Sequence, residues 1–334
     1  MKPFHPPRNL PVRLVELGAT PPAESQAVYH ALAEAMTPEQ PDTVVLTRPA
    51  SAYLCLGYHQ VFESVLDAGV CRRRGLPVLR RRVGGGATYL DADQLFYQFI
   101  FHHSRVPANF RRTYQYLLGG PVAALNTLGL AARLHELNEV EVGEARVAGV
   151  GGGQIGEACV VVGNYLLDFD YGAMTEVWAA PWPSFRELAG NALRAHVSGL
   201  RRLKPGLDEA ALNARLKEAL PAALGRPLQP GALTDREKEL ARNIGERLGG
   251  KAYLGLHRER GTAPMRSLKV SARAHIHGVE GRSDGTPLQA SLFLFEQHVR
   301  EARVMEAPGG ARMHQLETRL QGMDLPAARD LLEE

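Results

Sequence analysis

Lysine is scarce in this chain and is missing from most of its first two thirds. The chain has 334 residues and 39 basic side chains, but lysine stands at only six positions and at none between residues 3 and 203. The six positions are Lys2, Lys204, Lys217, Lys238, Lys251 and Lys269. Cationic chemistry within residues 3–203 therefore depends on arginine, which can bind an anion at two points but does not release a proton at physiological pH.

Cysteine and long apolar runs are also sparse. Cys55, Cys71 and Cys159 form no Cys-x-x-Cys pair, which argues against a disulfide framework or a structural zinc site and fits a reducing cytoplasm. The N-terminus lacks the apolar segment of a signal peptide. No stretch reaches the roughly 18 to 20 apolar residues that span a bilayer. We therefore expect a cytoplasmic protein that does not enter a membrane.

The net charge is too small to indicate a nucleic-acid partner. It is only +3, although two arginine triplets, Arg72–Arg74 and Arg80–Arg82, lie close together. A nucleic-acid surface would combine clustered charge with stacking aromatic residues, whereas these triplets flank a turn and a strand. We expect no nucleic acid among the partners.

The stretch VLRRRVGGGATYLD, residues 78–91, places arginines directly before three glycines. Gly84–Gly86 can adopt positive φ, let a ligand approach the backbone and offer N–H groups to an anion. Arg80 and Arg81 would add bidentate donors for carboxylate or phosphate. The spacing matches neither the dinucleotide-binding motif nor the Walker motif. The residues alone favour equally an anionic, elongated ligand along this main chain and a mobile turn with solvated arginines.

The pattern of apolar residues, caps and breakers predicts a chain of mixed strands and helices. Strands are predicted at 12–17, on both sides of Pro49, at 76–81, at 92–103 and after a second glycine cluster that ends at Gly153. Helices are predicted at 22–36, 62–74, 109–128 and 208–225, and a capping box of Thr234 with Glu237 opens another at 234–250. Strands at 267–281 and 287–296 and a helix near 313–322 then predict a small C-terminal domain.

The run LRRRVGGGATYLD resembles the arginine–glycine signature of the lipoate-protein ligase A and octanoyl (lipoyl) transferase family, within the biotin/lipoate ligase superfamily. The resemblance extends upstream to LCLGYHQ, where Gly57, Tyr58 and Gln60 are in register. Downstream it covers the stretch from Asn138 to Asp168. It therefore spans most of the chain, and the arginine–glycine segment is its most specific part.

The resemblance implies an α/β (α+β) fold. Residues 1–255 would form a biotin/lipoate ligase-like catalytic domain, a mixed sheet with flanking helices, and residues 256–334 a small C-terminal accessory domain. The implied activity is attachment or transfer of a lipoyl or octanoyl group to a lysine of a carrier domain. A ligase would use lipoate or octanoate with ATP and Mg²⁺, whereas a transferase would take the acyl group from an acyl carrier protein.

The resemblance also implies which residues hold the acyl group. The apolar tail would lie along the glycine-rich main chain, and Arg80 or Arg81 would face the carboxylate or phosphate end. Asn138 would shape the turn that presents the cation of the site. The full set implied for substrate binding is Arg80, Arg81, Gly84, Gly85, Gly86, Ala87, Tyr58, Gln60, Asn138 and Gly149.

The chain departs from the family pattern at the catalytic position. Arg146 stands where the family has a lysine, three residues before Gly149 in the sequence RVAG. Leu90 and Val162 replace two histidines. Arginine keeps the charge, so electrostatic stabilisation is retained, but proton transfer from an amine is lost. Two hypotheses follow: an enzyme that uses Arg146, and a non-catalytic relative that binds lipoate or an acyl-adenylate as a sensor or scaffold.

Other polar residues are interpreted more simply. Cys159 lies in an apolar strand and is predicted to be a small core residue rather than a nucleophile. Asp168 and Asp170 could bind Mg²⁺ through water, but a solvated strand face is favoured. His275 and His277 share a strand face without a third ligand, so no metal site is predicted.

Overall fold

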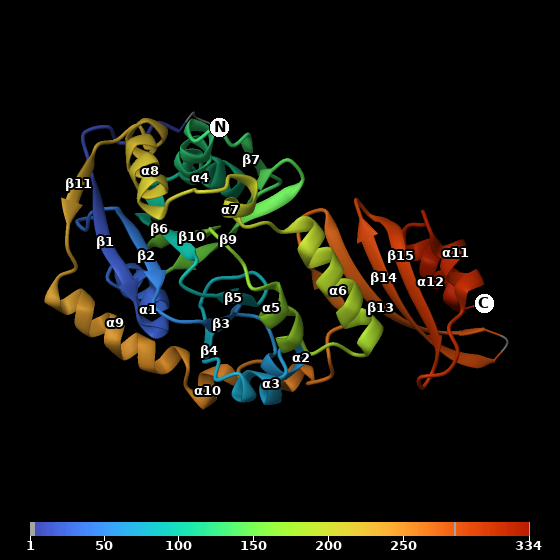
Figure 1. Cartoon of the computed structure of the whole chain (residues 1–334). Helices are drawn as coiled ribbons and strands as arrows, with labels where there is room; N and C mark the ends of the chain where they lie inside the picture. Colours follow the sequence, from blue (N-terminus) through green and yellow to red (C-terminus); the bar gives the residue numbers. More distant parts are fainter. Residues whose placement is uncertain (1–3, 284, 334) are drawn as a thin grey trace. The chain divides into compact units, whose positions relative to one another are not determined.

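The computed structural model describes residues 4–283 and 285–333 of the chain (Figure 1). These residues form two compact units, each assembled from segments that are separate in the sequence. The first unit combines the residues up to Gln60 with Cys71–Phe169 and Ser198–His257. The second unit combines Val61–Val70 and Asp170–Val197 with the residues from Arg258 onward. The division into domains at residue 255 stays a prediction, because a compact unit is not a test of independent folding.

An eight-stranded sheet organises the first unit. Its strand order is β11-β1-β2-β6-β10-β9-β8-β7, with β1 parallel to both β2 and β11 and antiparallel pairing elsewhere. The strands are β1 (Val12–Thr20), β2 (Thr43–Pro49), β6 (Gln94–His102), β7 (Ala132–His135), β8 (Glu139–Val142), β9 (Ala145–Ile155), β10 (Ala158–Leu166) and β11 (Leu228–Gly231). A second sheet of order β4-β3-β5 contains β3 (Tyr53–Leu56), β4 (Val78–Arg80) and β5 (Thr88–Leu90).

Helices cover both faces of the large sheet. On one face α4 (Phe110–Thr127) and α8 (Glu209–Leu224) lie side by side and share a core with strand residues such as Phe99 (Figure 1). On the other face α1 (Pro22–Glu34) and α9 (Asp235–Leu248) pack with the small sheet through residues such as Leu32 and Leu79. Full burial of such a side chain contributes about 1.5–3 kcal/mol to folding. The small sheet therefore holds the glycine segment that follows β4 on the α1 face.

A four-stranded antiparallel sheet organises the second unit. Its strands are β12 (Ser267–Lys269), β13 (Ala274–Ser283), β14 (Thr286–Phe295) and β15 (His298–Glu306), in that order. Helices α11 (His314–Leu320) and α12 (Leu325–Glu333) pack on one face, against residues such as Leu292. Helix α6 (Pro183–His196) packs against β13 and β14, where the Trp182 indole N–H donates to the Ser291 hydroxyl at 2.6 Å.

The remaining elements are short. They are α2 (Phe62–Val65), α3 (Ala68–Arg73), η1 (His103–Arg105), α5 (Tyr171–Val177), α7 (Leu200–Leu203), α10 (Lys251–Leu254) and η2 (Arg258–Arg260). The single helix predicted at 62–74 is wrong, because α2 and α3 are separate. Leu66 between them is extended and forms an isolated β-bridge with Trp178, while the Asp67 carboxylate accepts from the Val70 N–H at 2.9 Å.

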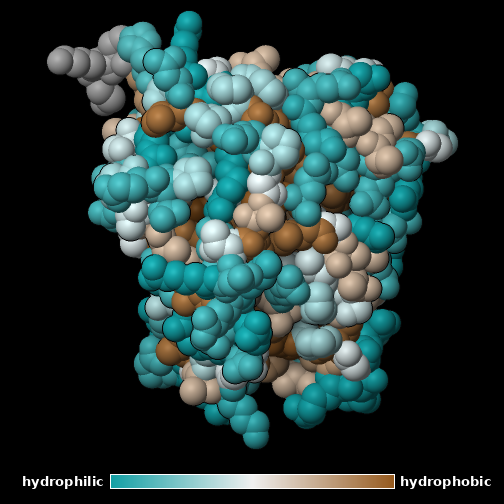
Figure 2. Space-filling view, turned by 90° about the vertical axis from the view of Figure 1, so that its left-hand side faces the viewer, coloured by the Kyte–Doolittle hydropathy of each residue, from teal (hydrophilic) through white to brown (hydrophobic). Residues whose placement is uncertain are grey.

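The sequence predicted most other elements. The capping box of Thr234 and Glu237 opens α9 as expected, with both reciprocal hydrogen bonds present. The large mixed sheet with helices and the small antiparallel sheet confirm the predicted α/β (α+β) class. Figure 2 shows hydrophilic residues over most of one face, with apolar residues visible between them. Within the described residues, no helix is long and apolar enough to cross a membrane.

Candidate functional site

The segment Val83–Gly86, here called the glycine loop, follows β4 and packs tightly against backbone. A Cβ atom placed on Gly57 would lie 1.9 Å from the Gly85 carbonyl oxygen. A Cβ atom placed on Gly151 of β9 would lie 3.2 Å from the Gly84 carbonyl oxygen. The first contact excludes any side chain and the second leaves almost no room for one. Glycine at 57 and 151 therefore allows the loop to lie directly on main chain.

The second glycine cluster provides the surface under the loop. Gly149, Gly151 and Gly153 alternate along β9, so all three face the same side of the sheet. Val83 packs over Gly153, with a 3.7 Å approach to its ideal Cβ position. Gly152 faces the opposite side, where Tyr114 of α4 approaches. The result is a strip of sheet without side chains on the face that carries the glycine loop.

Arg81 shapes the glycine loop from within. Its side chain is buried, and its Nη2 donates to the carbonyl oxygens of Gly84 and Gly86 at 2.9 and 2.8 Å. Its Nη1 donates to the Cys55 carbonyl of β3 at 3.1 Å. One guanidinium group thus holds both ends of the loop at fixed spacing and ties them to the small sheet.

Arg80 is fully buried and acts on the main chain as well. Its guanidinium donates to six carbonyl oxygens, in the turn that follows β3 and at the end of α10. These acceptors belong to Gly57, Tyr58, Gln60, Tyr253, Leu254 and Leu256. Arg80 and Arg81 therefore donate to main-chain carbonyls of the protein itself. Their role in holding the acidic head of a ligand stays a prediction.

The amides of the glycine loop are the donors left for a ligand. Within residues 4–283 and 285–333, the N–H groups of Gly84, Gly85 and Gly86 have no hydrogen-bond acceptor in the protein. Gly85 has a φ of 100°, which lets successive N–H groups turn toward a common point. Ala87 follows, half-buried, at the start of the connection to β5. This arrangement can bind an anion through main chain alone.

The turn after β3 is tied to the loop. The Tyr58 N–H donates to the Val83 carbonyl at 3.1 Å, and the Gln60 side-chain oxygen accepts from the Gly57 N–H at 3.0 Å. The Tyr58 ring meets the His257 ring edge-on, with centroids 5.5 Å apart. Tyr58 and Gln60 are thus brought to the glycine loop, and the Gln60 amide oxygen is already used within the turn.

Arg146, Asn138 and Gly149 are brought together on β8 and β9. The Arg146 Nη1 lies 3.8 Å from the carboxylate of Glu139, which is directly opposite Gly149 in the strand register. The Arg146 Nε is buried and finds no hydrogen-bond partner in the described part of the chain. The Asn138 side-chain amide donates to the Val150 carbonyl at 3.0 Å. A buried donor without an acceptor costs about 1–3 kcal/mol, so Arg146 favours an incoming anion.

Sequence reasoning missed two buried carboxylates beside Arg146. Glu139 and Glu141 are 3% and 0% exposed, and Glu141 lies 3.4 Å from Arg133 and 3.7 Å from His135. The signal was the alternation of EVEV over β8, which was interpreted only as strands and turns. Since cross-strand neighbours on β7 and β9 are basic, this end of the sheet carries a compact set of opposite charges.

The other residues named from the sequence lie apart from this arrangement or have simple roles. Burial raises the pKa of Cys159 to about 11, so its thiol is protonated near neutral pH and is a poor nucleophile. The Asp170 carboxylate caps α5 by accepting from the Ala173 N–H at 2.8 Å. In the part of the chain that the structure describes, no group of three His, Cys, Asp or Glu side chains is placed to hold a metal ion.

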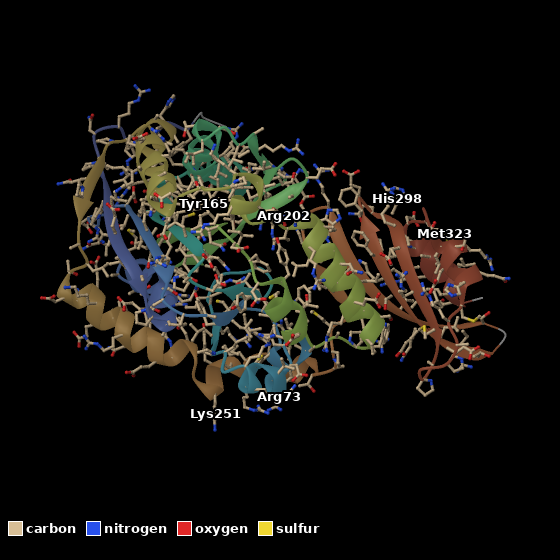
Figure 3. All side chains as sticks on the ribbon, viewed as in Figure 1. Arg73, Tyr165, Arg202, Lys251, His298 and Met323 are labelled. Atoms are coloured by element: carbon tan, nitrogen blue, oxygen red, sulfur yellow. The ribbon has the colours of Figure 1, made fainter. Side chains whose placement is uncertain are left out.

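The positions that lack the family's histidines are apolar contacts. Leu90 is buried in β5, and Val162 of β10 lies opposite Gly151 and packs against the α1-side core. Lys204 and Lys251 are exposed in the first unit, and Figure 3 shows Lys251 pointing outward from α10. Lys269 is exposed in the second unit.

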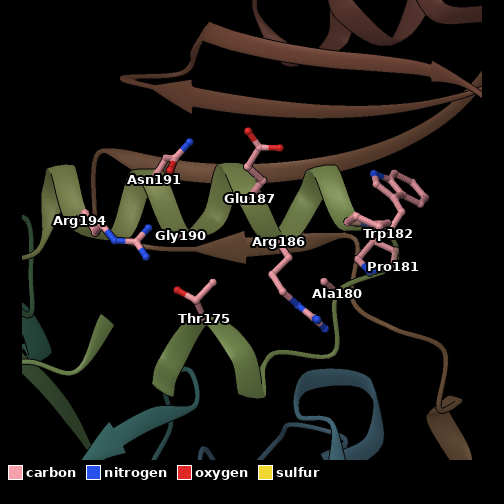
Figure 4. A pocket seen from close by; sticks show the side chains of 10 residues that line it. Thr175, Ala180, Pro181, Trp182, Arg186, Glu187, Gly190, Asn191 and Arg194 are labelled. Carbon is pink, nitrogen blue, oxygen red and sulfur yellow. The ribbon is translucent and has the colours of Figure 1, made fainter. Parts of the chain in front are cut away.

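A pocket of about 550 Å³ lies within the second unit, between α5 and α6 (Figure 4). Arg186 projects from α6 toward α5, where Thr175 lies, and Arg194 and Glu187 of α6 also line the pocket. Trp182 closes one end. None of the residues predicted from the sequence lines this pocket, so it is not part of the site built around the glycine loop.

Comparison with known proteins gives a consistent result. Residues 21–221, more than half of the chain, match the family model described as the lipoyl protein ligase A/B catalytic domain. The chain is 25% identical over 199 residues to lipoate-protein ligase A subunit 1 of Thermoplasma acidophilum, spanning 57% of this chain and 75% of that protein. It is 27% identical over 260 residues to the octanoyltransferase LipM of Kyrpidia tusciae, spanning 70% of this chain and 94% of that protein.

Solved structures share the fold. The bi-partite lipoate protein ligase of an archaeal lipoylation system from Thermoplasma acidophilum has a TM-score of 0.68 and 24% identity, covering 75% of this chain and 98% of that chain. A lipoate-protein ligase A bound with ATP has a TM-score of 0.63 and 20% identity, covering 74% of this chain and 100% of that chain. These matches confirm the resemblance and the ligase-like fold predicted from the arginine–glycine segment.

Proposed function

Because the chain belongs to the lipoyl protein ligase A/B catalytic domain family, we propose that it attaches or transfers a lipoyl or octanoyl group to a lysine of a carrier domain. The similar proteins are named as a ligase and as an octanoyltransferase, so the family supports an enzyme of one of these two kinds. The archaeal ligase was analysed with its E2 lipoyl domain, which supports a lipoyl domain as acceptor. The non-catalytic alternative is not favoured by these relatives.

The proposal rests on main-chain and guanidinium donors that lie beside a glycine-rich stretch of β9. Among the residues that the structure describes, the Gly84–Gly86 amides and the Arg146 Nε are donors without acceptors. The alternating glycines of β9 let the glycine loop lie directly on the strand, with the Gly84 carbonyl over Gly151 and Val83 over Gly153. An acyl chain would lie beside this loop, and its carboxylate or phosphate end would accept from these donors.

Arg146 defines which chemistry the chain can perform. Its guanidinium can stabilise negative charge that develops on a carboxylate or phosphate oxygen. It stays protonated throughout, so the proton of the acceptor lysine must leave to another group or to water. Orientation and charge stabilisation are therefore the parts of the reaction that this residue supplies.

ATP and Mg²⁺ belong to the ligase form of the proposal. Three consecutive free amides and a partly satisfied guanidinium fit a phosphate group, which supports a nucleotide as co-substrate. When bound, ATP would activate the acyl carboxylate. For Mg²⁺, the described residues offer no preformed set of three ligands, so no step is assigned to the metal. A cytoplasmic location likewise stays a prediction.

The test is an acceptor mass assay with two donors. Purified protein is incubated with a lipoyl domain and either octanoate or lipoate plus ATP, or octanoyl-acyl carrier protein without ATP. Acylation of the acceptor lysine with the free acid identifies a ligase, and acylation with the carrier identifies a transferase. A control acceptor whose target lysine is replaced by arginine should gain no mass.

Absence of any mass increase with either donor would overturn the enzymatic proposal. Calorimetry then separates the remaining possibilities. Tight binding of lipoate or a lipoyl-adenylate analogue without turnover would identify a sensor or scaffold, whereas no binding at all would remove the acyl site itself.

A further inference from the structure

The main chain that enters the glycine loop depends on one buried histidine. Strand β4 ends at Arg80, and the Arg81 N–H donates to the Leu56 carbonyl at 3.0 Å. The next amide, that of Arg82, lies beyond the strand ladder and donates to the His30 Nε2 at 2.9 Å. His30 belongs to α1, which packs against the large sheet from the same side as the small sheet.

The hydrogen bonds of His30 fix its tautomer. Its Nδ1 lies 2.7 Å from the Gln26 carbonyl oxygen, which can only accept, so Nδ1 carries the proton. Its Nε2 therefore presents a lone pair to the Arg82 N–H. The ring is fully buried and stacks on Tyr29, with centroids 4.1 Å apart. The imidazole thus forms a rigid bridge between the main chain of α1 and the main chain that leads into the loop.

Burial, with the cationic side chains around it, keeps His30 neutral. Arg81 and Arg82 lie on the loop side of His30, and Arg247 lies on the α9 side. The positive charge of all three disfavours protonation of the imidazole. Glu34 is the carboxylate on this side, and it pairs with Arg82 and with Arg247. Burial, the larger effect, lowers the pKa of His30 to about 3. Its Nε2 therefore stays an acceptor at neutral pH.

We infer that His30 is a positioning residue for the glycine loop, which sets the direction of the Gly84–Gly86 amides through its hydrogen bond to Arg82. This inference rests on the proposed function in one respect only, since the loop is taken as the acyl-binding segment. Without the imidazole acceptor, the Arg82 N–H has no partner among the described residues, and the loop entry is released from α1. Arg81 would still hold the loop's carbonyls and tie them to the small sheet, so the loop would keep its shape while losing its attachment to α1.

Two amide substitutions form a matched test. The glutamine amide in His30→Gln reaches the place of Nε2, whereas the shorter asparagine amide in His30→Asn reaches only the place of Nδ1. Hydrogen exchange is measured for the Arg82 amide, resolved by nuclear magnetic resonance, and, as a control, for the amides of β14. His30→Asn should raise exchange of the Arg82 amide about tenfold, the equivalent of one lost hydrogen bond of about 1.4 kcal/mol, and leave β14 unchanged. His30→Gln should restore near wild-type exchange.

Kinetics give the second readout. His30→Asn should raise the KM for the acyl donor by about fivefold to tenfold with kcat changed less than about twofold, because the loop amides bind ground state and transition state alike. His30→Gln should recover the wild-type KM. If His30→Asn does not accumulate as folded protein, His30→Phe takes its place, since it fills the same volume without an acceptor.

Either of two results would overturn the inference. One is unchanged exchange of the Arg82 amide, together with an unchanged KM, in folded His30→Asn. The other is an equal rise in all amides, including those of β14, which would mean that His30 only supports global stability. The exchange readout needs no substrate, so a wild-type protein without acyl turnover would refute the proposed function and leave the role of His30 to be decided by exchange.

Discussion

Arg146 is only partly neutralised by the carboxylate beside it. The pair with Glu139 is long, at 3.8 Å, and the Nε edge of the guanidinium is buried with no partner among residues 4–283 and 285–333. An anion that accepts from this edge would satisfy the orphaned donor and gain a charge-assisted hydrogen bond of about 1.5–3 kcal/mol. The residue is therefore prepared for an anion in spite of the carboxylate beside it.

Removing the charge at this position should weaken the reaction strongly. Arg146→Gln is expected to lower kcat/KM about 10- to 100-fold, the loss of one charge-assisted hydrogen bond. Arg146→Lys keeps the charge and should retain or raise turnover in the acceptor mass assay. A glutamine variant as active as the wild type would contradict the assignment of Arg146 to the site.

Gly57 and Gly84 offer a matched pair for the loop. Gly57→Ala places a methyl group 1.9 Å from the Gly85 carbonyl and should cost about 1–3 kcal/mol of stability while displacing the loop. Gly84→Ala meets nothing within 4 Å and has no positive φ, so the melting temperature should stay near the wild-type value. Equal melting temperatures for both variants would contradict the packing described for Gly57.

Local sequence could identify the loop but not the partners of its arginines. The run of arginines before glycines left an anion site and a solvated turn equally favoured, and the family resemblance selected the anion site, which stays a prediction. The acceptors of Arg80 at Tyr253 and Leu254 are 173 and 174 residues away, so no local pattern could show that this side chain faces its own main chain. His30 was equally invisible, since a buried helical histidine has the pattern of an ordinary core residue.

At the scale of elements, β9 contacts a different element on each face of the large sheet. Its glycines alternate, so one set faces the loop and Gly152 faces α4. The sequence showed the cluster as a run of small residues leading into a strand, but the reason for each glycine lies on a neighbouring element. Helices with complete caps, such as α9, were predictable because their signals are local. The break between α2 and α3 was not, since its cause is a bridge to Trp178.

The spacing of β9 and α4 can be tested with a double substitution. A Cβ on Gly152 would lie 2.4 Å from the Tyr114 hydroxyl oxygen and 2.8 Å from the Val160 carbonyl oxygen. Gly152→Ala should therefore lower the free energy of unfolding by about 1–3 kcal/mol. Tyr114→Phe removes the closer atom and should recover part of this loss in the double variant. Additive losses in denaturant titrations would show that the two groups do not meet.

At the scale of the whole molecule, the second unit includes α6, which comes from the middle of the chain. Trp182 and Phe185 of α6 are buried, and both approach Gly278 of β13. A boundary at residue 255 follows the change of pattern in the sequence, but it assigns α6 to the catalytic domain, whereas α6 belongs to the second unit. Contacts between distant segments decided this feature, and composition alone does not show them.

A chain ending at residue 255 should therefore associate and be less stable than the full chain. Removal of β13 and β14 exposes the apolar face of α6, and we expect association in size-exclusion chromatography and a lower melting temperature. Replacing Trp182 and Phe185 by serine in the shortened chain should restore a monomer. A monomeric 1–255 chain that melts like the full chain would support the boundary predicted from sequence.

Stability should fall in acid through His30. The unfolded chain binds a proton there near the ordinary pKa of 6.5, whereas the folded chain binds one only near 3. The unfolded state therefore takes up more protons between these values, and the free energy of unfolding decreases as pH falls from 6.5 toward 3, by at most a few kcal/mol. Folded His30→Phe lacks this contribution, so its stability should depend less steeply on pH. Parallel pH profiles for the two proteins would refute the neutral, buried state of His30.

The hydrogen bonds of Arg80 to distant carbonyls have a consequence for synthesis on the ribosome. At about 5–20 residues per second, its carbonyl partners at Tyr253 and Leu254 leave the ribosome roughly 9 to 35 seconds after Arg80 does. Its acceptors at Gly57, Tyr58 and Gln60 are synthesised before Arg80, whereas those at Tyr253, Leu254 and Leu256 follow much later. The complete set of hydrogen bonds around Arg80 can therefore form only after α10 has emerged, so the main chain that leads into the glycine loop reaches its final state late in synthesis.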